Sequence, residues 1–144
     1  MIYLAADHRG FDLKVKIKEW LKEWNYEYED MGAFEYDKDD DYPDFISKAA
    51  EKVSQDPDNS KAIIMGGSGQ GEAMVANRYK NVRAAVFYGG SEEVIKLSRE
   101  HNDANVLSLG TFFVDIQIAQ KAIKLWLETP FSGEERHKRR IFKF

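Results

Sequence analysis

The segment IIMGGSGQGEAM, residues 63–74, places four glycines and one glutamate directly after an apolar run. Glycine-rich turns between a strand and a helix usually bind phosphate through backbone N–H groups, so a carboxylate is unexpected there. The dinucleotide-binding motif needs a glycine where Glu72 stands. The triphosphate-binding loop needs lysine and then Ser or Thr where Glu72 and Ala73 stand. The segment therefore fails both nucleotide-binding motifs at the same residue.

A carboxylate beside free backbone N–H groups supports a different chemistry. The N–H groups can stabilise a substrate oxygen as it gains negative charge, and Glu72 can take a proton from the adjacent carbon. Together they describe proton abstraction next to a carbonyl, which is the chemistry of aldose–ketose isomerisation. Alternatively, Glu72 only complements the dipole of the following helix, which contributes about 0.3–1 kcal/mol. The glycine-rich turn alone leaves both interpretations open.

Two further segments carry residues capable of chemistry. In SREHNDANV, residues 98–106, His101 and Asn102 stand at the end of a helical pattern. They can equally be a plain helix terminus, because Asn tolerates the left-handed conformation. Near the C-terminus, Arg136 and Arg140 lie four positions apart, so on a helix they would share one face and could bind a phosphate together. A solvated basic tail is the alternative for this last segment.

Composition limits the class of protein. A chain of 144 residues has the size of one compact domain, and we expect a single domain over residues 1–144. The net charge of −4 argues against nucleic-acid binding, and the lack of cysteine excludes disulfides and a thiol nucleophile. No apolar run reaches the roughly 20 residues that span a bilayer, and the N-terminus lacks a signal peptide. We therefore expect a cytoplasmic protein that binds neither membranes nor nucleic acid.

The elements that must position these residues follow an alternating pattern. Strand patterns at residues 1–6, 26–32, 61–67, 81–88 and 105–110 alternate with helical patterns that begin near Leu13, Pro43, Gly71, Ser91 (as N-cap) and Ala119. This alternation predicts an α/β fold with a five-stranded parallel sheet and helices on both faces. Ligands bind beyond the carboxyl ends of such strands, which are followed here by Asp7 and His8, the glycine-rich turn, residues 88–90 and residues 110–111. The acidic run DKDDDYPD, residues 37–44, is expected to be a solvated loop.

Taken together and in order, the segments AADHRGF, DDDYPDF, GGSGQGE, ANR, REHNDANVL and ERHKRR resemble the type B ribose-5-phosphate isomerases. These belong to the sugar-phosphate isomerase family that also includes galactose-6-phosphate isomerases, and the resemblance extends from Met1 to about Ile141. It implies a Rossmann-like three-layer sandwich and an enzyme without metal or cofactor. It also implies homodimers or tetramers whose active site lies at the dimer interface.

The resemblance assigns a role to each matching position. The family uses either a cysteine that opens the glycine-rich loop or a glutamate that closes it, and Gly66 and Glu72 identify the glutamate type. Glu72 would move a proton between C1 and C2 through a cis-enediol(ate), His101 would open the sugar ring, and Ser68 is grouped with these catalytic residues. The matching substrate-binding positions are Asp7, His8, Gly67, Ser68, Gly69, Gln70, Gly71, Asn102, Arg136 and Arg140, with His137 in the phosphate region. The basic tail, residues 131–144, would complete the phosphate site.

Phe112 departs from the family pattern. It stands in the run SLGTFFVD, where the family usually has an arginine that binds phosphate. A charge-assisted contact contributes roughly 1.5–3 kcal/mol, so its loss would weaken binding by about one to two decades. Lys138 or Arg139 could compensate, or the substrate could be a different phosphorylated or free sugar. The expected function is the interconversion of ribose 5-phosphate and ribulose 5-phosphate, with a non-catalytic sugar-phosphate-binding protein as the alternative of another class.

Overall fold

The computed structural model describes all of residues 1–144. Strands and helices alternate up to Glu128, and a short helix follows in the basic C-terminal segment. The elements are β1 (Ile2–Ala6), α1 (Phe11–Glu23), β2 (Tyr28–Asp30), α2 (Pro43–Gln55), β3 (Lys61–Gly66), α3 (Gln70–Ala76), β4 (Ala84–Phe87), α4 (Glu93–Glu100), β5 (Val106–Gly110), α5 (Ile116–Glu128) and α6 (Glu135–Ile141). The predicted alternation of five strands with five helices is confirmed, and α6 is additional.

The five strands form one parallel sheet in the order β2-β1-β3-β5-β4. From β1 the chain first moves outward to β2 and then returns past β1 to β3, so the strand order reverses between β1 and β3. In an open parallel sheet such a reversal leaves a crevice at the carboxyl ends of the two strands. Asp7 follows β1 and the glycine-rich turn follows β3, so both flank this crevice.

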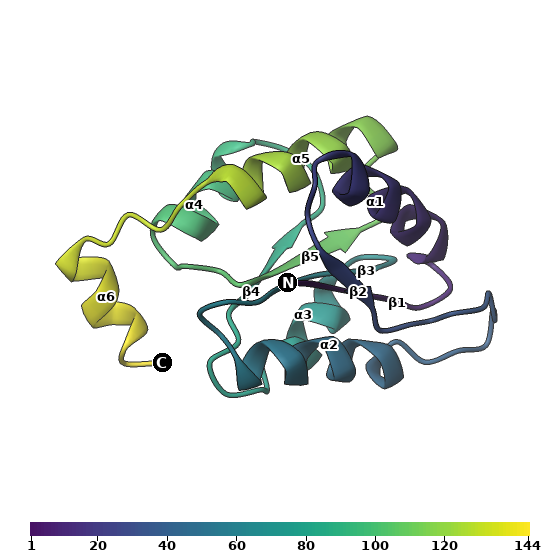
Figure 1. The fold of residues 1–144 in the computed structure, drawn as a ribbon, viewed down its shortest axis with the longest axis horizontal. Coiled ribbons are helices and arrows are strands. Elements are labelled where there is room, and N and C mark those ends of the chain that lie inside the picture. The colour runs from purple at the N-terminus through teal and green to yellow at the C-terminus, as the bar shows by residue number, and fades with distance from the viewer.

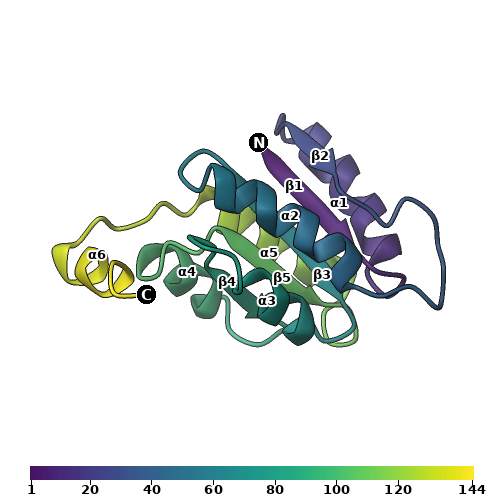
Figure 2. The same cartoon turned by 90° about the horizontal axis from the view of Figure 1, so that it is seen from below.

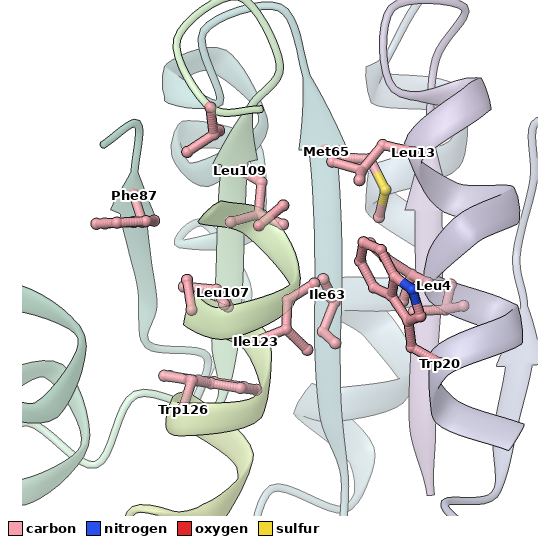
Figure 3. Packing of buried hydrophobic residues seen from close by; sticks show 14 of the residues in the cluster. Leu4, Leu13, Trp20, Ile63, Met65, Phe87, Leu107, Leu109, Ile123 and Trp126 are labelled. Carbon is pink, nitrogen blue, oxygen red and sulfur yellow. The ribbon is translucent and has the colours of Figure 1, made fainter. Parts of the chain in front are cut away.

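Helices cover both faces of the sheet, which gives the predicted three layers. The helices α1, α4 and α5 lie on one face, and α2 and α3 lie on the other (Figure 1). On the first face, Trp20 of α1 and Trp126 of α5 pack with Leu4, Ile63 and Leu107 of the strands (Figure 3). The second face packs Ile46, Ala49, Ala50 and Val53 of α2 and Ala76 of α3 on alternate strand residues. Both layers fix the strand ends that carry the candidate site.

Two expected details at the ends of α4 are wrong. Glu92, not Ser91, is the N-cap residue, and the Ser91 hydroxyl instead accepts a hydrogen bond of 3.2 Å from the backbone N–H of Glu93. At the other end, the left-handed residue is Asp103, with φ 46°, and not Asn102. His101 is the C-cap residue of this helix. The left-handed residue after α4 therefore comes one position later than the sequence pattern indicates.

The helix α6 lies apart from the sheet. It projects at the end of the molecule opposite the 31–42 loop, at the far end of an extended connection (Figures 1 and 2). The backbone N–H of Ser132 donates to the carbonyl of Glu100, and the ring of His137 stacks on that of His101 with centroids 4.2 Å apart. These contacts tie α6 to the end of α4. None of the helices combines the length and the apolar character needed to span a bilayer.

Candidate active site

The glycine-rich turn is held tightly between β3 and the turn after β5. The carbonyls of Gly66 and Gly67 accept hydrogen bonds of 2.9 Å from the backbone N–H groups of Thr111 and Phe112. The Ser108 hydroxyl donates to the carbonyl of Gly69 at 2.6 Å. Gly69 has φ +77°, a left-handed conformation that favours glycine. The turn is thus a rigid extension of the sheet, and its N–H groups at the start of α3 have no helical partner.

Glu72 lies buried in this turn, with 4% of its surface exposed. Burial raises the pKa of its carboxyl group, the negative charge of Asp7 adds to the increase, and the backbone N–H of Glu72 partly offsets it. A carboxylate with a raised pKa is a stronger base, which suits proton abstraction near neutral pH. A Cβ atom on Gly66 would overlap the Glu72 carboxylate. A side chain at position 66, which opens the loop, would therefore need the space that Glu72 occupies, so only one of the two positions can carry a side chain there.

His8 is oriented by an acidic residue that the sequence analysis left in a solvated loop. Its Nδ1 lies 2.6 Å from Oδ1 of Asp40, and its backbone N–H donates to the same oxygen at 3.0 Å. Because a carboxylate oxygen only accepts, Nδ1 carries the proton in this contact and Nε2 stays free for a ligand. The side chain of Asp40 is only 7% exposed, although residues 37–39 of the same loop are exposed. The expectation of a fully solvated loop is therefore wrong at Asp40.

Asp7 completes this corner of the site. Its Oδ1 accepts hydrogen bonds from the backbone N–H groups of Arg9 and Gly10, at 2.9 and 3.3 Å, and so fixes the turn that leads into α1. Asp7, His8 and Asp40 each offer one metal-ligand atom within 4.8 Å of the others. A metal ion at this position would have to replace the hydrogen bond between His8 and Asp40. The geometry as it stands is that of an oriented histidine.

The other predicted residues lie at the amino ends of the strands, here called the amino edge of the sheet, opposite the carboxyl edge that carries Glu72. The helix α4 runs back from the carboxyl end of β4, so His101 and Asn102 come just before the start of β5. The buried guanidinium of Arg99 holds this turn, because it donates to Asp103, to the carbonyl of Ala104 and to the carbonyl of Thr129. The same side chain thereby fixes the start of the connection to α6.

The predicted phosphate residues lie on α6, next to His101. Arg136 and Arg140 are both exposed and share one face of the helix, as their spacing predicts. His137 is 3% exposed; burial, together with the neighbouring His101, lowers its pKa. Its Nε2 is buried without a hydrogen-bond partner. The two stacked histidines and the two arginines thus lie together at the amino edge of the sheet, where Arg136 is paired with Glu134 at 2.8 Å.

The predicted site residues therefore form two groups, one at each edge of the sheet. The carboxyl-edge group consists of Asp7, His8, the 67–71 loop and Glu72, and the amino-edge group consists of His101, Asn102, Arg136, His137 and Arg140. A strand of six residues, such as β3, is roughly 17 Å long at about 3.3 Å per residue. General acids and bases act within about 3 Å of the group that they serve. One sugar cannot contact both groups of the same chain.

Residues 2–144 match the model of the protein family described as Ribose/Galactose Isomerase. The chain is 41% identical over 140 residues to ribose-5-phosphate isomerase B of Mycobacterium tuberculosis, and the match covers 97% of this chain and 85% of that protein. The structure of ribose-5-phosphate isomerase B from Mycoplasma genitalium with bound ribulose-5-phosphate is 40% identical and has a TM-score of 0.94, covering 99% and 91% of the two chains. The enzyme from Clostridium thermocellum is 37% identical with a TM-score of 0.91, covering 99% and 93%.

A doubly covered parallel sheet, a buried carboxylate in a glycine-rich turn and these matches define an isomerase with an α/β fold. The chain belongs to the ribose/galactose isomerase family. The expected resemblance and the expected Rossmann-like fold are thus confirmed.

Two residues beside the site escaped the sequence analysis. Asp40 contacts His8 across 32 positions of the chain, and the hydroxyl of Tyr42 lies against Gly71. Both belong to the segment DDDYPDF, which contributed to the family resemblance. That resemblance was the only available signal, because a contact across 32 positions leaves no periodic pattern in the sequence.

Proposed function

We propose that this protein interconverts D-ribose 5-phosphate and D-ribulose 5-phosphate. The observation that carries the proposal is the buried Glu72 carboxylate, with its raised pKa, beside the N–H groups of the glycine-rich turn. Relatives named ribose-5-phosphate isomerase B, at 40–41% identity, support the substrate. So does the similar Mycoplasma genitalium structure, which has bound ribulose-5-phosphate.

The reaction divides into ring opening and proton transfer. His101 protonates the ring oxygen of the furanose while the anomeric hydroxyl gives its proton to water, which leaves the open-chain aldose. Glu72 then removes the C2 proton as the carbonyl oxygen at C1 gains charge, and the N–H groups of the 67–71 loop stabilise the resulting cis-enediol(ate). Return of the proton from Glu72 to C1, with transfer of the O2 proton to O1, gives the ketose. Ser68 and Gln70 lie in the same loop and contact sugar oxygens.

We further propose that a second copy of the chain completes each site. The separation of the two groups across the sheet supports this arrangement, because Glu72 and His101 of one chain cannot reach the same sugar. The helix α6 extends away from its own sheet and is free to reach another (Figure 1). In a symmetric dimer the carboxyl-edge group of each chain would face the amino-edge group of its partner, which gives two equivalent sites. The 131–144 segment would then close the phosphate end of the partner's site.

The substrate is tested by offering aldoses with and without phosphate in one assay. Ribose 5-phosphate is expected to react with a higher kcat/KM than ribose, other pentose phosphates and hexose phosphates, because the α6 arginines bind the phosphate. A faster reaction with a free sugar or with a hexose phosphate would replace the proposed substrate. Binding of ribose 5-phosphate without any turnover would instead favour a non-catalytic binding protein.

A further inference from the structure

Arg9 joins the two turns that frame the carboxyl-edge group. Its backbone N–H donates to Oδ1 of Asp7 after β1, and its carbonyl accepts from the hydroxyl of Thr111 after β5. The guanidinium carbon lies 5.2 Å from the centroid of the Phe112 ring. Contact with the ring face of an aromatic residue favours a cation at that position. Phe112 therefore serves as a platform for the charged end of Arg9.

Phe112 in turn packs directly on the glycine-rich turn. A Cβ atom on Gly67 would come within 2.5 Å of the Phe112 ring, so nothing separates this ring from the loop. Gly67, Phe112 and the guanidinium of Arg9 thus follow one another at the rim of the site. Arg9 is exposed, so its charged end is open to solvent.

The charge balance at this edge calls for such a cation. Asp7 and Glu72 belong to this group and Asp40 lies beside it, and their negative charges oppose the entry of a dianionic phosphate. Arg9 makes no ion pair with any of them, so its charge is available to a ligand. By contrast, Lys138 on α6 lies 3.6 Å from a Glu135 carboxylate and would reach this site only from a partner chain. Within the same chain, Arg9 is therefore nearer to this rim than Lys138 or Arg139, the residues expected to compensate for Phe112.

We propose that Arg9 binds the phosphate of the sugar phosphate from the turn after β1, with Phe112 holding its guanidinium in place. The arginine expected after β5 is thus exchanged for an aromatic platform, and the positive charge comes from the neighbouring turn instead. The proposal rests on the proposed function. It names the phosphate contact that comes from the same chain as Glu72, whereas the α6 arginines come from the partner. A guanidinium can donate two parallel hydrogen bonds to a phosphate, as the missing arginine would.

The test compares Arg9→Met with Lys22→Met, a matched change at an exposed lysine on α1. Loss of a charge-assisted phosphate contact is expected to raise KM for ribose 5-phosphate by about one to two decades. The reaction of unphosphorylated ribose, however slow, should change little, and Lys22→Met should change neither. The double variant Arg9→Met with Phe112→Arg should regain most of the lost affinity, because it returns a cation to the same rim from the β5 turn. A purely structural role of Arg9 predicts no such rescue.

An Arg9→Met enzyme with an unchanged KM for ribose 5-phosphate would overturn the proposal, as would an equal loss with phosphorylated and free sugar. The parental protein is assayed first, so an absent ribose 5-phosphate activity is recognised as a failure of the proposed function. In that case, binding of inorganic phosphate is measured by calorimetry on the parent and on Arg9→Met. Weaker binding by the variant upholds the Arg9 site, and equal binding overturns it.

Discussion

Two inactive variants should restore activity when they share a dimer, because the structure separates Glu72 from His101 across the sheet. Glu72→Gln removes the proposed base at the carboxyl edge, and His101→Ala removes the proposed ring-opening acid at the amino edge. Each variant alone should lose about 10²- to 10⁴-fold in rate. In a mixed dimer, Glu72 of the His101→Ala chain faces His101 of the Glu72→Gln chain, and this one site is intact. The other site of the mixed dimer carries both changes.

The size of the recovery follows from counting sites. Random pairing of equal amounts gives about half mixed dimers, and each has one intact site of two, so about a quarter of the parental activity should return. The two chains are co-expressed with different tags, mixed species are isolated by sequential affinity steps, and ribose 5-phosphate isomerisation is measured. Purified mixed dimers should reach about half of the parental activity per dimer.

The control pairs two changes at the same edge, Glu72→Gln with Asp7→Asn. Every site of that mixed dimer carries one change, so no activity beyond that of the single variants should return. Inactive mixed dimers of Glu72→Gln with His101→Ala, confirmed as dimers by native mass spectrometry, would refute a site that is shared between two chains. Recovery by the same-edge pair would refute it as well.

Three further predictions concern the carboxyl-edge group. Because burial raises the pKa of Glu72, the acidic limb of kcat/KM should lie above the ordinary carboxyl value of 4.5, and a limb at or below that value would contradict its burial. The same shift means that ionised Glu72 destabilises the fold, so Glu72→Gln should raise the free energy of unfolding at neutral pH. This gain in stability should shrink as the pH falls through the raised pKa of Glu72 and should vanish below the ordinary carboxyl pKa. Urea unfolding at several pH values measures the gain. Asp40→Ala should lower kcat/KM about 10- to 100-fold because His8 loses its orientation, and Tm should change little since Oδ2 of Asp40 is buried without a hydrogen-bond partner. Asp40→Asn keeps an acceptor for His8 and should lose less activity. Equal losses in both variants would argue against a positioning role of Asp40.

The sequence was sufficient for the fold because the strand and helix patterns are strong and alternate without interruption. The glycine-rich turn could be interpreted for a similar reason: Glu72 stands within six positions of Gly66, so their proximity is local. Family resemblance supplied the proposed roles of His101 and the α6 arginines, whose own patterns also fit a helix end and a solvated tail.

What the sequence did not predict depends on contacts between distant segments. The bond between Asp40 and His8 spans 32 positions, and the stacking of Arg9 on Phe112 joins the turns of two strands that are not neighbours in the sheet. The separation of His101 from Glu72 could have been anticipated, since a helix that follows a parallel strand must return to the amino edge.

Exchange of the sugar C2 proton with solvent tests most directly whether Glu72 moves the proton. Ribose 5-phosphate is incubated in D2O with the parent and with Glu72→Gln, and deuterium at C2 of the recovered aldose is followed by NMR. Glu51→Gln, at an exposed glutamate on α2, serves as the matched control. We predict exchange with the parent and with Glu51→Gln, and a rate at least about 10²-fold lower with Glu72→Gln, which should still bind the sugar phosphate. Exchange by Glu72→Gln within a few-fold of the parent would contradict the assignment of Glu72 as the base.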